Sequence, residues 1–225
     1  MDVMIDKEAK MRNPGILIGY AVIEGVSVDK TQKTLKKEIM SVINSVKDKY
    51  HSRVDMYATK PIKEIRDLFK KTGIDPSRYT PSAEALLKRI IDGKDLYRIN
   101  NVVECNNVGS MKFELPMGVY NLNRLVGDIV FKFGSDSDIM ETMAKGEMNM
   151  KDILLTRDNE KLFGSPISDS PHAMITEDTK NVLLLVYGTT GIGKDYVSKA
   201  TEYTARKITE YAGGIISKLE VIASE

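Results

Sequence analysis

The chain of 225 residues carries 33 Lys and Arg against 32 Asp and Glu, and this formal net charge of +1 excludes a bulk attraction to nucleic acid or membrane surfaces. The single cysteine, Cys105, excludes an internal disulfide, and with only two histidines the chain lacks the material for a structural zinc site. No apolar run reaches membrane-spanning length and no secretory signal is evident, so we expect a globular cytoplasmic protein without metal or other cofactor.

The chain is expected to form one domain over residues 15–225, after a flexible segment at 1–14. Residues 15–28 are rich in Ile, Val and Tyr, which predicts one strand or a tight pair of strands. Apolar spacing then predicts a helix that follows the capping residue Asp29, and three more behind it. The four helices are expected over about 30–48, 60–72, 81–91 and 96–107.

The second half changes character, because short apolar runs alternate with turns rich in Gly, Asp, Asn and Ser. Strands are predicted over 128–133, 153–156, 173–176, 182–187 and 218–222, with one long helix over about 194–212 before the last of them. This order predicts an α+β fold, in which N-terminal helices are followed by short mixed or antiparallel strands and one long C-terminal helix.

One motif invites a different interpretation. Residues 188–194, GTTGIGK, match a phosphate-binding loop except that Asp195 stands where a Ser or Thr should bind Mg²⁺. A carboxylate at that place repels a triphosphate, and only about 30 residues follow Lys194, too few for the later strands of a nucleotide hydrolase. We therefore interpret the motif as a strand-to-helix turn and do not expect an ATPase.

A succession of five segments carries more information than any one of them. They are RYTPSAEALL at 78–87, VECNN at 103–107, LPMGVYNL at 115–122, GSPISDS at 164–170 and ITEDTKNVLL at 175–184. In order and spacing they resemble the B3/B4 domain of the phenylalanyl-tRNA synthetase β subunit, over roughly residues 15–222. The chain is similar to that domain as a stand-alone protein, without the catalytic, anticodon-binding or oligonucleotide-binding parts of the synthetase.

The resemblance implies a ligand pocket. In that family the domain removes wrongly attached tyrosine from the tRNA for phenylalanine, with a Thr-Asn pair, a His, a Gly-rich loop and a Glu around the substrate. By position, Asn106 and Asn107 replace the pair, Gly118 replaces the His and Leu185 replaces the Glu. The loop becomes more polar. The implied ligand-binding residues are Asn106, Asn107, Gly118, Ser168, Asp169, Ser170 and Leu185.

These replacements change the expected chemistry. Leu185 cannot bond a tyrosine hydroxyl, and Gly118 offers no imidazole to orient water or an ester. We therefore do not expect tyrosine-specific hydrolysis; if hydrolysis of an aminoacyl ester persists, Asp169 is the candidate base. Gly118 should enlarge the cavity and Leu185 should give it an apolar floor, so that the guest has one apolar end and one polar end.

Two functions remain open on the sequence. The protein is either an editing-like factor that acts on an aminoacyl-type ligand or a tRNA, or a small-molecule binding module without catalysis or a tRNA partner. Single residues are open too: Asn107 could cap a helix end, and Asp169 could bond its own turn. Basic residues on the second and third helices are interrupted by acidic ones, which is typical of a solvated face. No DNA or membrane partner is expected, and the oligomeric state is not predicted.

Overall fold

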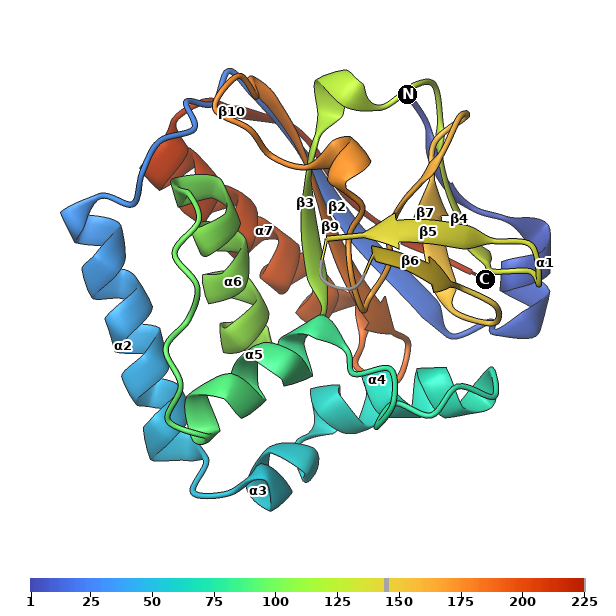
Figure 1. Cartoon of the computed structure of the whole chain (residues 1–225), viewed down its shortest axis with the longest axis horizontal. Helices are drawn as coiled ribbons and strands as arrows, with labels where there is room; N and C mark the ends of the chain where they lie inside the picture. The colour runs from blue at the N-terminus through green and yellow to red at the C-terminus, as the bar shows by residue number, and fades with distance from the viewer. Residues whose placement is uncertain (144–145, 225) are drawn as a thin grey trace.

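The computed structural model describes residues 1–143 and 146–224, and its centre is a four-stranded antiparallel sheet (Figure 1). The strand order is β10–β2–β9–β3, and the two inner strands are buried along almost their whole length. A strand covered on both faces needs a continuous apolar run, and the two inner strands supply one each. The strands are β2 (Ile16–Glu24), β3 (Met117–Asn121), β9 (Asn181–Thr189) and β10 (Ile215–Ala223).

A second sheet of four strands, in the order β1–β4–β7–β8, packs against one face of the central sheet. Side chains of both sheets, among them Tyr20, Phe131 and Phe163, form a shared core between them. The strands are β1 (Val3–Ile5), β4 (Ile129–Phe133), β7 (Leu154–Arg157) and β8 (Leu162–Gly164). Residues 1–14, for which we expected a flexible segment, form β1 and helix α1 (Lys7–Arg12), and β1 pairs in parallel with β4.

Helices cover the other face of the central sheet. Helices α6 and α7 contact its strands directly, α2 lies outside α6, and α3 to α5 group at one end of the molecule (Figure 1). The helices are α2 (Lys33–Lys49), α3 (Arg53–Tyr57), α4 (Lys60–Lys71), α5 (Ser82–Ile91), α6 (Asn101–Phe113) and α7 (Lys194–Ala212). A hairpin of β5 (Ile139–Thr142) and β6 (Gly146–Asn149) and two 3₁₀ turns, η1 (Leu122–Arg124) and η2 (Pro171–Ala173), complete the fold.

The predicted α+β fold is confirmed, and the differences from the sequence prediction are local. The helix expected over 96–107 begins at Asn101, after an Asn100 side chain that accepts a hydrogen bond from the backbone of Val103. It continues to Phe113, where Glu114 takes the left-handed conformation with φ of 58°. The prediction of a strand over 173–176 was wrong, because the chain there leaves the η2 turn without pairing.

Helix α2 also begins later than predicted. Gln32, not Asp29, occupies its N-cap position. The backbone N–H of Asp29 instead donates to the side-chain oxygen of Asn101, at 3.0 Å. Asn101 thereby ties the segment before α2 to the first turn of α6, and the Asp29 carboxylate accepts a bond from the Ser27 hydroxyl at 3.2 Å instead of capping the helix.

In the loop between β9 and α7, close packing explains the glycine at position 191. Its strand, β9, is antiparallel to both neighbours, unlike the strand before a phosphate-binding loop. The Glu64 carboxylate lies against Gly191, where a Cβ would stand 2.0 Å from Oε2, and it accepts a hydrogen bond from Thr189 at 3.2 Å. An acidic group therefore packs against this loop, where a nucleotide would need positive charge.

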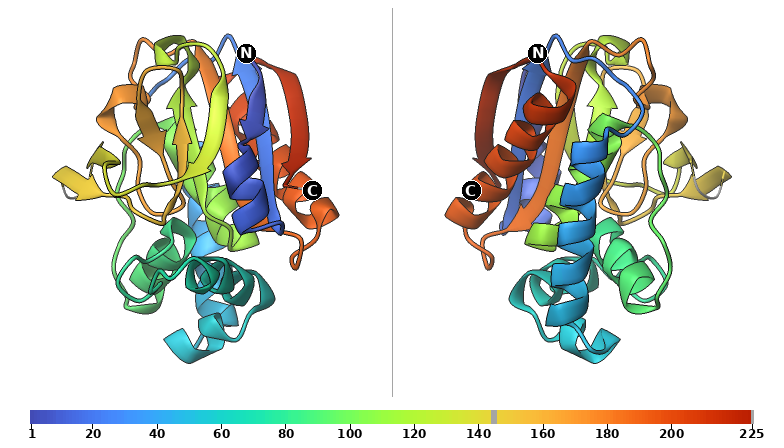
Figure 2. Two further views of the ribbon diagram at one scale, coloured as in Figure 1. Left: turned by 90° about the vertical axis from the view of Figure 1, so that its right-hand side faces the viewer. Right: turned by 90° about the vertical axis from the view of Figure 1, so that its left-hand side faces the viewer.

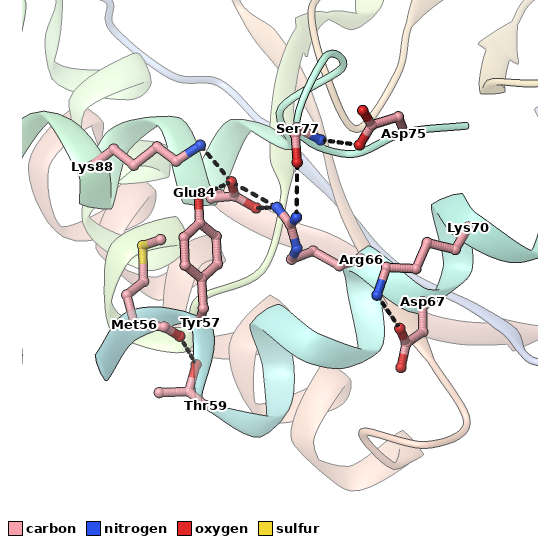
Figure 3. A network of polar contacts seen from close by, with 10 residues as sticks. All are labelled: Met56, Tyr57, Thr59, Arg66, Asp67, Lys70, Asp75, Ser77, Glu84 and Lys88. Atoms are coloured by element: carbon pink, nitrogen blue, oxygen red, sulfur yellow. Dashed lines mark hydrogen bonds and ion pairs between the residues drawn. The ribbon is translucent and has the colours of Figure 1, made fainter. Parts of the chain in front are cut away.

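A buried carboxylate, Glu84, holds α3, α4 and α5 together (Figure 3). Arg66 donates to both of its oxygens at 3.0 Å, Lys88 pairs with it at 2.6 Å, and the Tyr57 hydroxyl donates to it at 3.1 Å. Arg66 also reaches Ser77 at 3.2 Å, in the loop before α5. The Glu84 side chain is 1% exposed, so these donors replace the water it has lost.

Removal of this carboxylate should destabilise the helical layer. Glu84→Ala leaves two partly buried cations without their partner, for which we expect a loss of about 3 kcal/mol in the free energy of unfolding, measured with urea. The matched control is Glu202→Ala, which breaks an exposed ion pair with Arg206 one helical turn away. That control should cost no more than about 0.5 kcal/mol. Equal losses in the two variants would show that the Glu84 network does not hold the layer.

Candidate functional site

A cavity of about 670 Å³ lies at the β3 edge of the central sheet, between α5, α6 and the loop that follows β8. Most of its wall is apolar, and polar side chains gather in two places: against the loop after β8, and at the end of α5. The apolar wall includes Leu86, Val103, Met117, Val119, Ile167 and Ile175. A partly enclosed, mainly apolar hollow with a few converging polar groups is the usual form of a small-molecule site.

Asp169 is one of two acidic residues that the described chain places in the cavity wall, and the other, Asp92, is paired with Arg53. The Oδ1 of Asp169 accepts a hydrogen bond from the Tyr120 hydroxyl at 2.6 Å. Burial raises the pKa of Asp169 from 3.8 to about 7, and the bond from Tyr120 opposes only part of that shift. Among the described residues no basic side chain forms an ion pair with Asp169. The cavity therefore holds a carboxyl group that lacks a cation of its own.

Asn106 supplies a second acceptor. This side chain, 6% exposed, donates through Nδ2 to the Met117 carbonyl at 3.4 Å. Its Oδ1 is buried without a hydrogen-bond partner in the part of the chain that the structure describes. Buried polar atoms are nearly always bonded, so this acceptor beside the cavity is a candidate partner for a donor that enters from the cavity.

The Tyr120 hydroxyl owes its position to two glycines. A Cβ on Gly118 would stand 2.2 Å from this hydroxyl, and a Cβ on Gly164 would stand 2.3 Å from it. Gly118 therefore does not enlarge the cavity as we expected, because Tyr120 fills the space beside it. Burial raises the pKa of Tyr120 well above 10, which keeps the phenol a hydrogen-bond donor to Asp169.

The structure brings four of the seven residues implied by the resemblance into this cavity wall, namely Asn106, Asn107, Asp169 and Ser170. The other three lie elsewhere. Leu185 pairs with Gly118 across the strands and is fully buried in the core between the two sheets, so it is not the cavity floor. Ser168 stays in its loop, where its carbonyl accepts a bond from Ser165 at 2.8 Å.

Two open interpretations of single residues are settled by the geometry. Asn107 lies in the interior of α6, six residues before its end, so it does not cap that helix. The side-chain bond of Asp169 runs to Tyr120 and not to its own turn. Tyr120 was not among the residues expected in the site, although the alternation of a strand places Gly118 and Tyr120 on one face and could have indicated it.

Basic side chains line the cavity beside the end of α5, but two of the four are neutralised. Arg53 pairs with Asp92 and Lys88 pairs with Glu84. Arg89 stacks on the Tyr97 ring at 4.1 Å, and Lys94 is the fourth cation. Neither of these last two forms an ion pair within the described residues, so the net charge of this end is positive.

Residues 1–143 and 146–224 contain no group of three or more His, Cys, Asp or Glu side chains placed to hold a metal ion. Within the same residues, no helix combines the length and the apolarity that a bilayer crossing requires.

Comparison with known proteins identifies the family. Among solved structures, an N-terminal fragment of the phenylalanyl-tRNA synthetase β subunit from Pyrococcus horikoshii superposes with a TM-score of 0.50 at 16% identity. The match covers 96% of this chain and 50% of that fragment, so the chain spans about half its length, and at this identity the likeness concerns the fold. Comparison with curated protein sequences gives no match. Residues 64–213, more than half of the chain, match the family model of the B3/4 domain, and the protein therefore belongs to the B3/4 domain family.

Proposed function

We propose that the protein binds an aminoacyl-type molecule in the cavity at the β3 edge, with the amine toward Asp169 and Asn106 and an apolar side chain along the wall. The observation that carries the proposal is the Asp169 carboxyl group without a cation in the wall of a mainly apolar cavity, which is also lined by Asn106, whose buried oxygen has no partner. An ammonium group brings three hydrogen-bond donors and a positive charge. It can therefore donate to the Asn106 oxygen and pair with the Asp169 carboxylate.

The energetics favour such a ligand. A buried acceptor without a partner costs about 1–3 kcal/mol, which the first bound donor recovers. An ammonium beside Asp169 also lowers the pKa of that carboxyl group again, so binding and ionisation support each other near neutral pH. The apolar wall contributes through burial of the ligand's side chain, at roughly 25 cal/mol per Å².

The other end of the ligand would face the positive end of the cavity. An aminoacyl group attached to RNA would bring phosphates there, where Arg89 and Lys94 are available. We extend the proposal to tRNA as a partner on this ground and on family membership. The alternative, a module for a free small molecule, is favoured by the fact that Asp92 and Glu84 already neutralise the other two cations.

Calorimetric titration with leucinamide and phenylalaninamide tests the proposal, with their N-acetyl forms as matched ligands. Acetylation removes the ammonium, and loss of its charge-assisted bonds should weaken binding about ten- to a hundredfold. Asp169→Asn and Asn106→Leu should weaken the binding of the free amines in the same way. The control is Asp178→Asn, which neutralises an exposed carboxylate in a nearby turn. Equal affinity for free and acetylated amides would overturn the proposed orientation.

The partly buried Asp169 should give the empty protein a characteristic pH dependence of stability. Because its pKa rises from 3.8 to about 7 on folding, the folded state keeps a proton that the unfolded state has released between these values. The resulting stability is fully present below about pH 4 and is lost as the pH rises through about 7. Relative to Asp169→Asn, wild-type protein should lose about 2 kcal/mol of unfolding free energy between about pH 5 and 8. A constant difference in urea denaturation would contradict this burial.

Hydrolysis is the second candidate function, since a carboxyl group with a pKa near 7 suits a general base. Tyrosine-specific editing should nevertheless be absent, because Leu185 is buried away from the cavity and Gly118 carries no imidazole. We expect no release of tyrosine from the tRNA for phenylalanine above the spontaneous rate. Robust turnover at micromolar protein would contradict this, and its loss in Asp169→Asn would then identify the base.

A further inference from the structure

The central sheet has two edges, and only one of them faces the cavity. The other edge is β10, which pairs with β2 on its inner side and with no strand of the described chain on its outer side. It runs for nine residues along one side of the molecule, with no element beyond it (Figure 2). Its first residue, Ile215, is 68% exposed. Long open edges readily pair with another strand, and natural proteins usually shield them.

We propose that a second copy of this chain pairs with β10 through its own β10, antiparallel, so that the two central sheets become continuous. The sequence of β10 indicates that its partner is a second copy of the same strand. When two such strands pair around Leu219, the middle residue of the nine, Lys218 of each copy stands opposite Glu220 of the other. Pairing around Leu219 therefore lets all nine residues of the two strands overlap and also places opposite charges against each other.

In one chain the two charged side chains lie 3.9 Å apart as an ion pair, which a second copy would exchange for two cross-strand pairs. Lys218 and Glu220 lie on one face of the strand, opposite Val22 and Tyr20 of β2, and are 38% and 51% exposed. Tyr20 orients both, because its hydroxyl donates to Glu220 at 2.6 Å and its ring lies 5.3 Å from the Lys218 ammonium. The β-bulge of this strand lies between Ile216 and Lys218, outside the central three residues.

A charge on an edge strand more often prevents pairing than promotes it, and the arrangement decides which. Lysines alone would meet lysines in a second copy and repel it. Lys218 and Glu220 together convert the same contact into two attractive cross-strand pairs. The cavity lies at the opposite edge of the sheet, beyond β3, and stays open in such a dimer. The inference is thus independent of the proposed ligand.

Sedimentation velocity across a dilution series tests the proposal with charge reversals. Wild-type protein should reach twice its monomer mass of 25.2 kDa. Lys218→Glu or Glu220→Lys alone turns both attractive pairs into repulsive ones and should raise the dimer dissociation constant at least about tenfold. The double variant, and an equimolar mixture of the two single variants, restore opposite charges and should restore the dimer. Lys37→Glu, an equal charge change on α2, is the control and should leave the dissociation constant unchanged.

Each outcome decides the question. Recovery of the dimer in the double variant and in the mixture would establish both the strand and its register, and would also exclude a folding defect in the single variants. A monomer at every wild-type concentration would overturn the proposal. A dimer that the single reversals leave as tight as wild type would overturn it as well, because the second copy would then bind elsewhere.

Discussion

Burial of the central sheet on both faces is the constraint from which the rest of this structure follows. Strands β2 and β9 are apolar along their length, so each face of the sheet needs its own cover. Helices α6 and α7 provide one cover and the β1–β4–β7–β8 sheet provides the other. The two places for which we propose a binding partner lie at the edges of this sheet. The cavity lies beside β3, and the charged pair Lys218 and Glu220 lies on β10.

At the β3 edge, one phenol links the core to the cavity. The Tyr120 ring packs between the sheets, edge-on to Phe163 at 4.8 Å, while its hydroxyl reaches Asp169 in the cavity wall. The hydroxyl fits only because Gly118 and Gly164 present no Cβ to it. Asp169 is consequently held by a neutral donor and not by a cation. Burial raises the pKa of Asp169, and this neutral donor opposes only part of the shift; burial also acts on Asp138, but there the bonds from Lys132 and Ser135 outweigh it and lower the pKa.

Periodicity predicted most of the long elements, because their burial is regular. The α2 helix buries Leu35, Ile39, Ile43 and Val46 at helical spacing, and β9 is a single apolar run. Periodicity failed for the segments whose structure is determined by tertiary contacts. Strand β1 has three residues and is held by pairing with β4, and Leu96 is an apolar residue in the coil before α6 that extended the predicted helix.

The candidate site shows a different limit. Position in a family pattern assigned Gly118 and Leu185 to the pocket, but it does not say which face of a strand a residue occupies. Met117 and Val119 face the cavity and the helices, so their neighbour Gly118 must face the other sheet. Leu185 pairs directly with Gly118 across the two strands, so its side chain faces the other sheet as well. Two-residue alternation along β3, applied together with the resemblance, would have moved both residues out of the site and Tyr120 to its border.

The end of α5 limits what the cavity can gain from an anionic ligand group. Backbone carbonyls at a helix C-terminus carry partial negative charge, which Lys88 and Arg89 in the last turn of α5 already offset. Glu84, needed to join three helices, takes up the charge of Lys88. Only Arg89 and Lys94 remain, of which Arg89 is partly buried and Lys94 is exposed and screened by salt. An anion at this end would therefore add orientation more than affinity. The affinity must come from the desolvated part of the site, where Asn106 and Asp169 meet the apolar wall.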